Sequence, residues 1–197
     1  TILRKEMERL IIEFSWKSSQ IEGNTYTLLE TEILIKESKE AAGRKKEEAI
    51  MILDHKKALE FILKNKNKFK TISVDKIEHI HSIITSGLGI PRNIRKSLVG
   101  ITGTKYKPLD NAWQIREVLE KSCKMINKEK DIFTKSIAAS IMIAYIQPFE
   151  DGNKRTARLL SNAVLLAGNS CPLSFRNASE AEYNKSGLCS TSTLTSA

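Results

Sequence analysis

Two apolar segments separated by a short polar loop constrain this chain more than any other feature. The first covers residues 137–146 and the second covers residues 159–167. Pro148 disfavours a helical conformation at the residue before it, and Gly152 gives the loop conformational freedom. The pattern therefore predicts two buried helices joined by a tight loop, with the second helix beginning near Gly152 or Asn153.

The start of the second predicted helix combines features that favour anion binding. The first N–H groups of a helix have no partner within it and lie at the positive end of its dipole. Arg155 and Arg158 are three positions apart, so they share one helix face, with the Asn153 amide beside them. Asp151 would repel a phosphate unless a cation lay between them, and one carboxylate plus phosphate oxygens commonly hold magnesium. The loop therefore predicts a site for a magnesium-bound polyphosphate, although an Asp-Gly-Asn turn alone is also typical of helix capping.

Residues 147–158 resemble the signature of the Fic family, His-Pro-Phe-x-(Asp/Glu)-Gly-Asn-(Gly/Lys)-Arg-x-x-Arg. The chain has Gln-Pro-Phe-Glu-Asp-Gly-Asn-Lys-Arg-Thr-Ala-Arg there, so only the first position, Gln147, departs from it. Residues 18–23 also resemble the inhibitory pattern of this family, (Ser/Thr)-x-x-x-Glu-(Gly/Asn). In that pattern the glutamate pairs with the last arginine of the signature, which implies a contact between Glu22 and Arg158. Alone, the second string would equally fit an ordinary helix surface.

The resemblance implies transfer of AMP from ATP to a Ser, Thr or Tyr hydroxyl of a target protein. Asp151 would hold Mg²⁺ between the α- and β-phosphates. The residues implied in nucleotide binding are Gly152, Asn153, Lys154, Arg155 and Arg158. Glu22 would engage the Arg158 fork with both oxygens and so keep it from the γ-phosphate, and Ser18 would help to fix the helix end.

Gln147 stands where the family has the histidine that takes the proton from the attacking hydroxyl. A glutamine amide does not titrate near neutral pH and cannot act as a general base. Because general-base catalysis contributes roughly 10²–10⁴-fold, we expect nucleotide binding but poor transfer. Gln147 fits an engineered variant as well as natural divergence. Two alternatives stay open: a kinase toxin of the death-on-curing branch, which shares Lys154, and a non-catalytic nucleotide-binding module.

Residues 95–108 differ from the rest of the chain because their side chains favour strands. They predict a two-stranded hairpin. The resemblance implies that this hairpin, the flap, binds an extended segment of the target protein as an added strand. The flap residues expected to contact the target are Val99, Ile101, Thr102, Gly103, Thr104 and Tyr106. A purely structural hairpin over an edge of the core is the alternative.

Apolar residues at helical spacing predict the remaining elements. The expected helices cover residues 1–21, 27–40, 47–64, 74–86 and 110–126, the last of them capped by Asp110. The fold class is therefore all-α, a single domain of about seven to eight helices with one β-hairpin. Within it we expect an N-terminal inhibitory helix at residues 1–26, a catalytic core at 27–176, and a disordered or truncated tail at 177–197.

Histidine spacing argues against a zinc site. His79 and His81 are two positions apart on a predicted helix, so they point to different faces and cannot share a metal ion. We expect a structural role for His81.

Composition excludes several further classes of protein. No segment approaches the ~20 apolar residues of a membrane-spanning helix, and there is no secretory signal. Three widely spaced cysteines favour reduced thiols in the cytoplasm. The net charge of +9 lies largely on lysines that alternate with apolar residues, without the recognition helix of a nucleic-acid-binding protein. We therefore expect nucleotide and target protein as partners, no nucleic acid and no membrane, with a homo-oligomer left open. Because the chain begins at Thr1, we expect residues to precede it.

Overall fold

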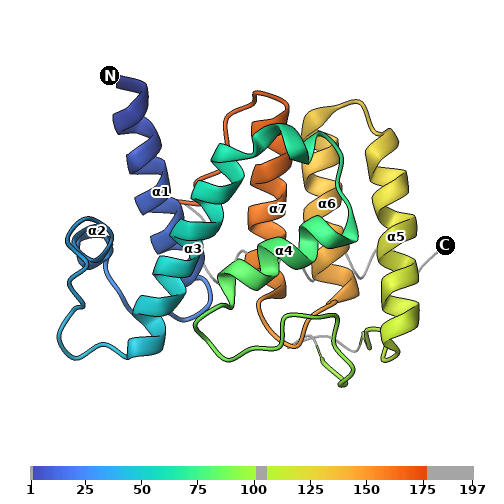
Figure 1. Cartoon of the computed structure of the whole chain (residues 1–197), viewed down its shortest axis with the longest axis horizontal. Helices are drawn as coiled ribbons and strands as arrows, with labels where there is room; N and C mark the ends of the chain where they lie inside the picture. The colour runs from blue at the N-terminus through green and yellow to red at the C-terminus, as the bar shows by residue number, and fades with distance from the viewer. Residues whose placement is uncertain (1, 101–105, 177–197) are drawn as a thin grey trace.

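A computed structural model describes residues 2–100 and 106–176 of the chain. Seven α-helices and one short 3-10 helix, η1, follow one another in this part of the chain (Figure 1). Their bounds are α1 (Ile2–Gln20), α2 (Leu28–Glu37), α3 (Lys46–Lys64), η1 (Lys66–Lys70), α4 (Val74–Ile84), α5 (Ala112–Lys128), α6 (Ile132–Ile146) and α7 (Asn153–Ala167). No strand occurs among these residues, so the predicted all-α fold is confirmed for them. None of their helices is long and apolar enough to cross a membrane.

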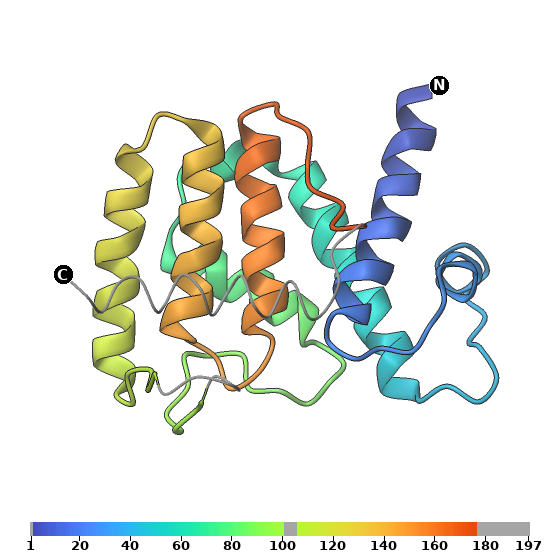
Figure 2. The same ribbon diagram turned by 180° about the vertical axis from the view of Figure 1, so that it is seen from behind.

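Helix α7 is the centre of the molecule. Every residue of α7 except Lys154 is buried, and the helix contacts α1, α3, α4, α6 and η1. In both views α6 and α7 stand side by side, with α5 on one side of this pair and α1 and α3 on the other (Figures 1 and 2). A helix that is buried all round must carry apolar side chains on most faces. The polar residues of α7 are concentrated at its N-terminal end, where the predicted anion site lies.

Side chains cap the starts of several helices. Thr27 and Glu30 form a capping box at the start of α2, because each side chain accepts the backbone N–H of the other residue, at 3.2 and 2.7 Å. Asp110 is not the cap of α5. Asn111 takes that position, and its side-chain oxygen accepts the backbone N–H groups of Trp113 and Gln114. Both residue types cap helices well, so sequence alone could not fix the boundary to one residue.

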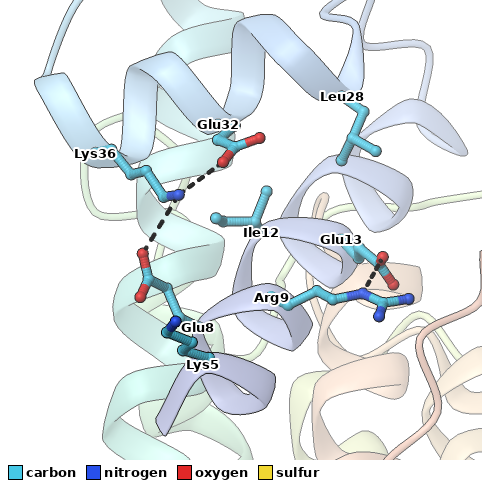
Figure 3. A pocket seen from close by; sticks show the side chains of 8 residues that line it. All are labelled: Lys5, Glu8, Arg9, Ile12, Glu13, Leu28, Glu32 and Lys36. Carbon is cyan, nitrogen blue, oxygen red and sulfur yellow. Dashed lines mark hydrogen bonds and ion pairs between the residues drawn. The ribbon is translucent and has the colours of Figure 1, made fainter. Parts of the chain in front are cut away.

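Helix α2 stands at the edge of the molecule and packs on α1 and α3. A pocket of about 480 Å³ opens between α1 and α2 (Figure 3). It is lined by Lys5, Glu8, Arg9, Ile12, Glu13, Leu28, Glu32 and Lys36. Lys36 bridges the two helices through Glu8 of α1 at 3.6 Å and Glu32 of α2 at 2.7 Å. This pocket shares no residue with the loop before α7.

The predicted flap hairpin is not confirmed. Residues 95–100 and 106–108 form no strand in the structure, and Ile101, Thr102, Gly103 and Thr104 lie outside the described residues. On the far side of this gap, the Tyr106 ring stacks on Tyr145 of α6, with ring centroids 4.3 Å apart. The flap therefore stays a prediction from the sequence.

Candidate nucleotide site at the start of helix α7

The loop between α6 and α7 takes the tight form that the sequence predicts. Gln147 ends α6 in a left-handed conformation with φ 50° and ψ 59°, and its side-chain Nε2 donates to the Ala144 carbonyl at 2.7 Å. Gly152 begins α7 at φ 81°, a conformation that other residues rarely adopt. A Cβ atom at Gly152 would also lie 3.4 Å from the His81 ring. Glycine therefore lets the start of α7 approach α4 closely.

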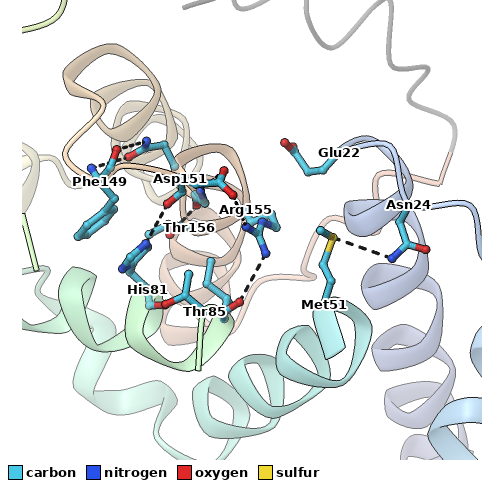
Figure 4. A network of polar contacts seen from close by, with 12 residues as sticks. Glu22, Asn24, Met51, His81, Thr85, Phe149, Asp151, Arg155 and Thr156 are labelled. Carbon is cyan, nitrogen blue, oxygen red and sulfur yellow. Dashed lines mark hydrogen bonds and ion pairs between the residues drawn. The ribbon is translucent and has the colours of Figure 1, made fainter. Parts of the chain in front are cut away.

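Two side chains hold this loop from within the core. Asn153 Oδ1 accepts the Phe149 N–H at 2.9 Å, and Asn153 Nδ2 donates to the Phe149 carbonyl at 2.8 Å. The buried Phe149 ring stacks on His81, with centroids 3.7 Å apart and planes inclined by 6° (Figure 4). His81 Nε2 lies 2.9 Å from the Asp151 carbonyl. A carbonyl only accepts, so Nε2 carries the proton.

These contacts bear on two expectations. The Asn153 amide, expected to contact phosphate, also holds the loop, because its oxygen and its nitrogen each bond to the Phe149 backbone. A short amide in a loop can serve either purpose, and its spacing in the sequence does not say which. The structural role expected of His81 is confirmed. Burial is the main influence on this ring and lowers its pKa.

Asp151 and Arg155 place opposite charges at the mouth of the loop. The Asp151 side chain is 67% exposed, whereas that of Arg155 is 2% exposed, and Asp151 Oδ2 lies 3.3 Å from Arg155 Nη2. The Gly152 N–H, expected to face a phosphate, donates to Asp151 Oδ1 at 2.5 Å. Lys154, the second residue of α7, is partly buried. The site therefore presents a buried cation beside an accessible carboxylate.

The donor set fits a metal ion that arrives with a substrate. No cluster of three or more His, Cys, Asp or Glu side chains that could hold a metal occurs in residues 2–100 and 106–176. Mg²⁺ is commonly held by one or two carboxylates together with substrate phosphates. The exposed Asp151 carboxylate at the N-terminal end of α7 suits that arrangement.

Arg158 lies one turn further into α7 and contacts the end of α1. Its guanidinium is buried, and Nη2 lies 2.8 Å from Glu22 Oε1. The same Nη2 donates to the Ser18 carbonyl at 2.8 Å, and Nε donates to Ser18 Oγ at 2.8 Å. The predicted contact between Glu22 and Arg158 is thus present across 136 positions of sequence. Besides the Glu22 carboxylate oxygen, two oxygens of Ser18 accept from the guanidinium, so Ser18 contacts Arg158 directly.

The position of Glu22 explains why the contact is stable. Glu22 follows the C-terminal end of α1, where the negative end of the helix dipole opposes a carboxylate. The Arg158 guanidinium offsets that charge. In turn, a buried guanidinium without charged or polar partners is costly. Figure 4 shows Glu22 on the α1 side, pointing toward Asp151 of the loop and Arg155 of α7.

Sequence reasoning missed Arg95. This arginine is 1% exposed. Its guanidinium donates to three backbone carbonyls, at 2.7 Å to Gln147, 2.7 Å to Ser97 and 2.5 Å to Leu109. Its own N–H donates to the Pro148 carbonyl at 2.9 Å. Arg95 therefore joins both sides of the predicted flap to the loop before α7, and nothing in its sequence context distinguishes it from the surface cations.

A model of the Fic/DOC family matches residues 71–165. This span contains α4 to α6, most of α7 and the loop with Asp151, whereas α1 to α3 lie outside it.

Two curated relatives are protein adenylyltransferases by name. A probable protein adenylyltransferase of Aquifex aeolicus (strain VF5) is 30% identical over 112 residues, covering 56% of this chain and 35% of the relative. Protein adenylyltransferase Fic of Nematostella vectensis is 27% identical over 190 residues, covering 92% of this chain and 43% of the relative. The chain therefore spans well under half the length of these curated relatives.

Solved structures support the fold. Fic-1 from C. elegans superposes with a TM-score of 0.77 at 23% identity, covering 91% of this chain and 55% of that chain. A Fic family protein from Desulfovibrio desulfuricans G20 also gives a TM-score of 0.77, at 18% identity, covering 95% of this chain and 59% of that chain. These similarities establish the helical architecture around the site.

Proposed function

Because residues 71–165 form a domain of the Fic/DOC family, we propose that this chain carries a protein adenylyltransferase site, in which AMP passes from ATP to a hydroxyl group of a target protein. The observation that carries the proposal is the buried pair of arginines, Arg155 and Arg158, at the N-terminal end of α7 beside the exposed Asp151. Guanidinium groups and free helix N–H groups suit a polyphosphate. In this proposal residues 27–176 are the catalytic core.

In this proposal a small set of side chains binds the nucleotide. Asp151 would hold Mg²⁺, which would offset negative charge on the phosphates. Arg155 and Lys154 would contact phosphate oxygens directly. Arg158 would hold the γ-phosphate once it is released from Glu22. The role of Asn153 is to fix the loop through Phe149, which keeps the α7 N-terminus directed at the ligand.

Chemistry limits this copy of the site. In the transfer, the target oxygen bonds to the α-phosphorus, the bond to pyrophosphate breaks, and the hydroxyl proton must leave. Gln147 cannot accept that proton, and its amide nitrogen is engaged by the Ala144 carbonyl. We therefore propose a site that binds nucleotide and transfers AMP poorly.

Target binding falls to the flap in this proposal. Val99 and Tyr106 flank the part of the flap outside the described residues, and Ile101, Thr102, Gly103 and Thr104 would supply the strand edge. Arg95 supports the proposal because it ties both flanks of the flap to the carbonyl of Gln147.

Self-inhibition is the regulatory part of the proposal. Residues 1–26, with α1, would act as the inhibitory element through Ser18 and Glu22. A guanidinium that donates to both residues cannot also hold the γ-phosphate. ATP would then bind with its terminal phosphate misplaced, whereas ADP would be less affected.

The test restores the missing base. Gln147→His should raise the incorporation of label from α-³²P-ATP by about 10²–10⁴-fold, in self-modification or in a lysate. A +AMP mass adduct would identify the product. Asp151→Ala in the same background is the matched control and should abolish the gain. Label from γ-³²P-ATP instead would show phosphate transfer and favour the kinase alternative. Absence of an adduct in Gln147→His, in Glu22→Gly and in the double variant would exclude the transferase.

A further inference from the structure

His55 is buried beside the inhibitory contact although it touches neither the loop nor Glu22. It lies on α3 with a relative exposure of 0%. Its Nε2 atom lies 2.8 Å from Ser18 Oγ, and its Nδ1 atom lies 3.2 Å from the Met51 carbonyl one turn earlier. Ser18 Oγ is also the acceptor for Arg158 Nε. A continuous chain of hydrogen bonds therefore runs from α3 through α1 to α7.

Elementary donor and acceptor rules fix the direction of this chain. The Met51 carbonyl only accepts, so His55 Nδ1 carries a proton. In a neutral ring Nε2 is then an acceptor, and the Ser18 hydroxyl donates to it. The Ser18 oxygen keeps its lone pairs for the Arg158 N–H, which can only donate. Ser18 therefore donates to His55 and accepts from Arg158, and these two roles are mutually consistent.

Surrounding charges keep the ring in that state. Arg155 and Arg158 of α7 are the charged groups that act on it, and both disfavour a second cation. From α1 the ring meets Ser18 and the Phe14 ring, whose centroid is 6.1 Å away. Burial and the two arginines lower the pKa of His55 well below its usual value. The ring is therefore neutral at neutral pH and can accept from Ser18.

We propose that His55 is a positioning residue for the inhibitory contact, which holds the Ser18 hydroxyl with its oxygen toward Arg158 and so keeps the end of α1 closed over the nucleotide site. This inference rests on the proposed self-inhibition and adds a residue from α3 to it. Ser18 accepts from Arg158 through its carbonyl and its hydroxyl oxygen, beside the Glu22 carboxylate, and His55 orients the hydroxyl.

The alternative is that His55 merely fills space in the core. The two cases differ in one consequence. Without an acceptor at Nε2, the buried Ser18 hydroxyl would lack its partner, and this loss would destabilise only the arrangement in which α1 contacts Arg158. ATP, which needs Arg158, would then compete better against α1. ADP, which lacks the γ-phosphate, would gain little. A general loosening of the core would instead weaken both nucleotides.

The experiment measures the affinities of Mg²⁺–ATP and Mg²⁺–ADP by calorimetry and takes their ratio. His55→Leu should raise the preference for ATP by about 5- to 20-fold. His55→Gln, whose amide oxygen can accept from Ser18, should restore a ratio near that of the unaltered chain. His79→Leu is the matched control, because His79 is exposed on α4 and lies against Phe61.

Glu22→Gly separates failure of the inference from failure of the proposed function. If Glu22→Gly raises the ATP preference and His55→Leu does not, His55 only packs and the inference is wrong. If Glu22→Gly itself leaves the ratio unchanged, the proposed inhibition is wrong and the inference falls with it. An ATP preference that rises equally in His55→Gln and His55→Leu would also overturn it, since the hydrogen bond would then not be the cause.

Discussion

The loop before α7 and the C-terminal end of α1 meet at one site, but different kinds of contact hold them there. The loop is fixed by side chains of the core that bond to its backbone: Asn153 to Phe149, His81 to Asp151, and Arg95 to Gln147. The end of α1 is held by the Arg158 side chain and the chain of hydrogen bonds behind it.

This difference divides the site into two parts. The permanent part is the loop before α7, and the detachable part is the C-terminal end of α1 with Ser18 and Glu22. Backbone contacts within the core cannot be replaced by a ligand, so the loop should keep its shape whether or not nucleotide is bound. The contacts of Arg158 are with acceptors that a phosphate can replace, because phosphate oxygens are strong acceptors for guanidinium groups. The loop thus forms an anion site before any ligand binds, and the end of α1 competes with the anion for the Arg158 guanidinium.

We expect the largest effect from removing the Phe149 ring, which anchors the permanent part of the site. Phe149→Ala deletes a fully buried ring and its stack on His81. We expect the free energy of unfolding to fall by about 3–5 kcal/mol. Phe133→Ala on the exposed face of α6 is the control, at 60% exposure, and should change it by less than about 0.5 kcal/mol. Urea titration followed by circular dichroism measures both, and equal losses would contradict the role given to Phe149.

Arg95 offers the next largest effect and tests whether the flap and the loop form one unit. Arg95→Met removes three hydrogen bonds from a charged donor to buried carbonyls, while also relieving the cost of burying the charge. We expect a net loss of about 2–3 kcal/mol of stability. Hydrogen exchange should increase at residues 95–100 and 147–150 together. Arg92→Met, at an exposed position nearby, is the control. Faster exchange on one side alone would show that Arg95 does not couple them.

Glu22→Gly should act on the detachable part alone. Loss of the charged partner of Arg158 should cost about 1–2 kcal/mol, and the affinity for Mg²⁺–ATP should rise by about tenfold. Hydrogen exchange should quicken in the last turn of α1 and stay unchanged in the loop. Glu13→Gln, a change on α1 away from the site, is the control. Faster exchange in residues 147–153 would mean that the loop before α7 depends on the contact with the end of α1.

The sequence predicts the permanent part better than the detachable part, and the reason is distance along the chain. Pro148, Gly152 and the flanking apolar runs act locally, so the loop and the buried helices follow from them. The contact of Glu22 with Arg158 spans 136 positions and was predictable only through the family pattern.

Residues whose partners lie far away and follow no pattern escaped prediction. Arg95 meets Gln147 across 52 positions, and His55 meets Ser18 across 37. The contacts of Asn153 with the Phe149 backbone escaped prediction for a related reason: sequence gives the donors and acceptors of a side chain but not its direction. Ser18 was expected only to fix the helix end, whereas two of its oxygens accept directly from the Arg158 guanidinium.

We expect the smallest of these effects from acid pH, which should lower the free energy of unfolding through the titration of His55. The folded state holds the pKa of His55 well below 6.5, so between that value and 6.5 the unfolded chain binds more protons than the folded one. The free energy of unfolding should therefore fall as pH drops below about 6.5, by at most about 1.4 kcal/mol per pH unit for this residue. His81, whose pKa is also lowered, adds a change of the same sign. His55→Gln removes one of the two contributions and should flatten the dependence of the urea midpoint on pH between about 5 and 7. Identical slopes in His55→Gln and the unaltered chain would mean that His55 binds its proton as readily in the folded chain as in the unfolded chain, which contradicts the neutral ring required by its hydrogen bond with Ser18.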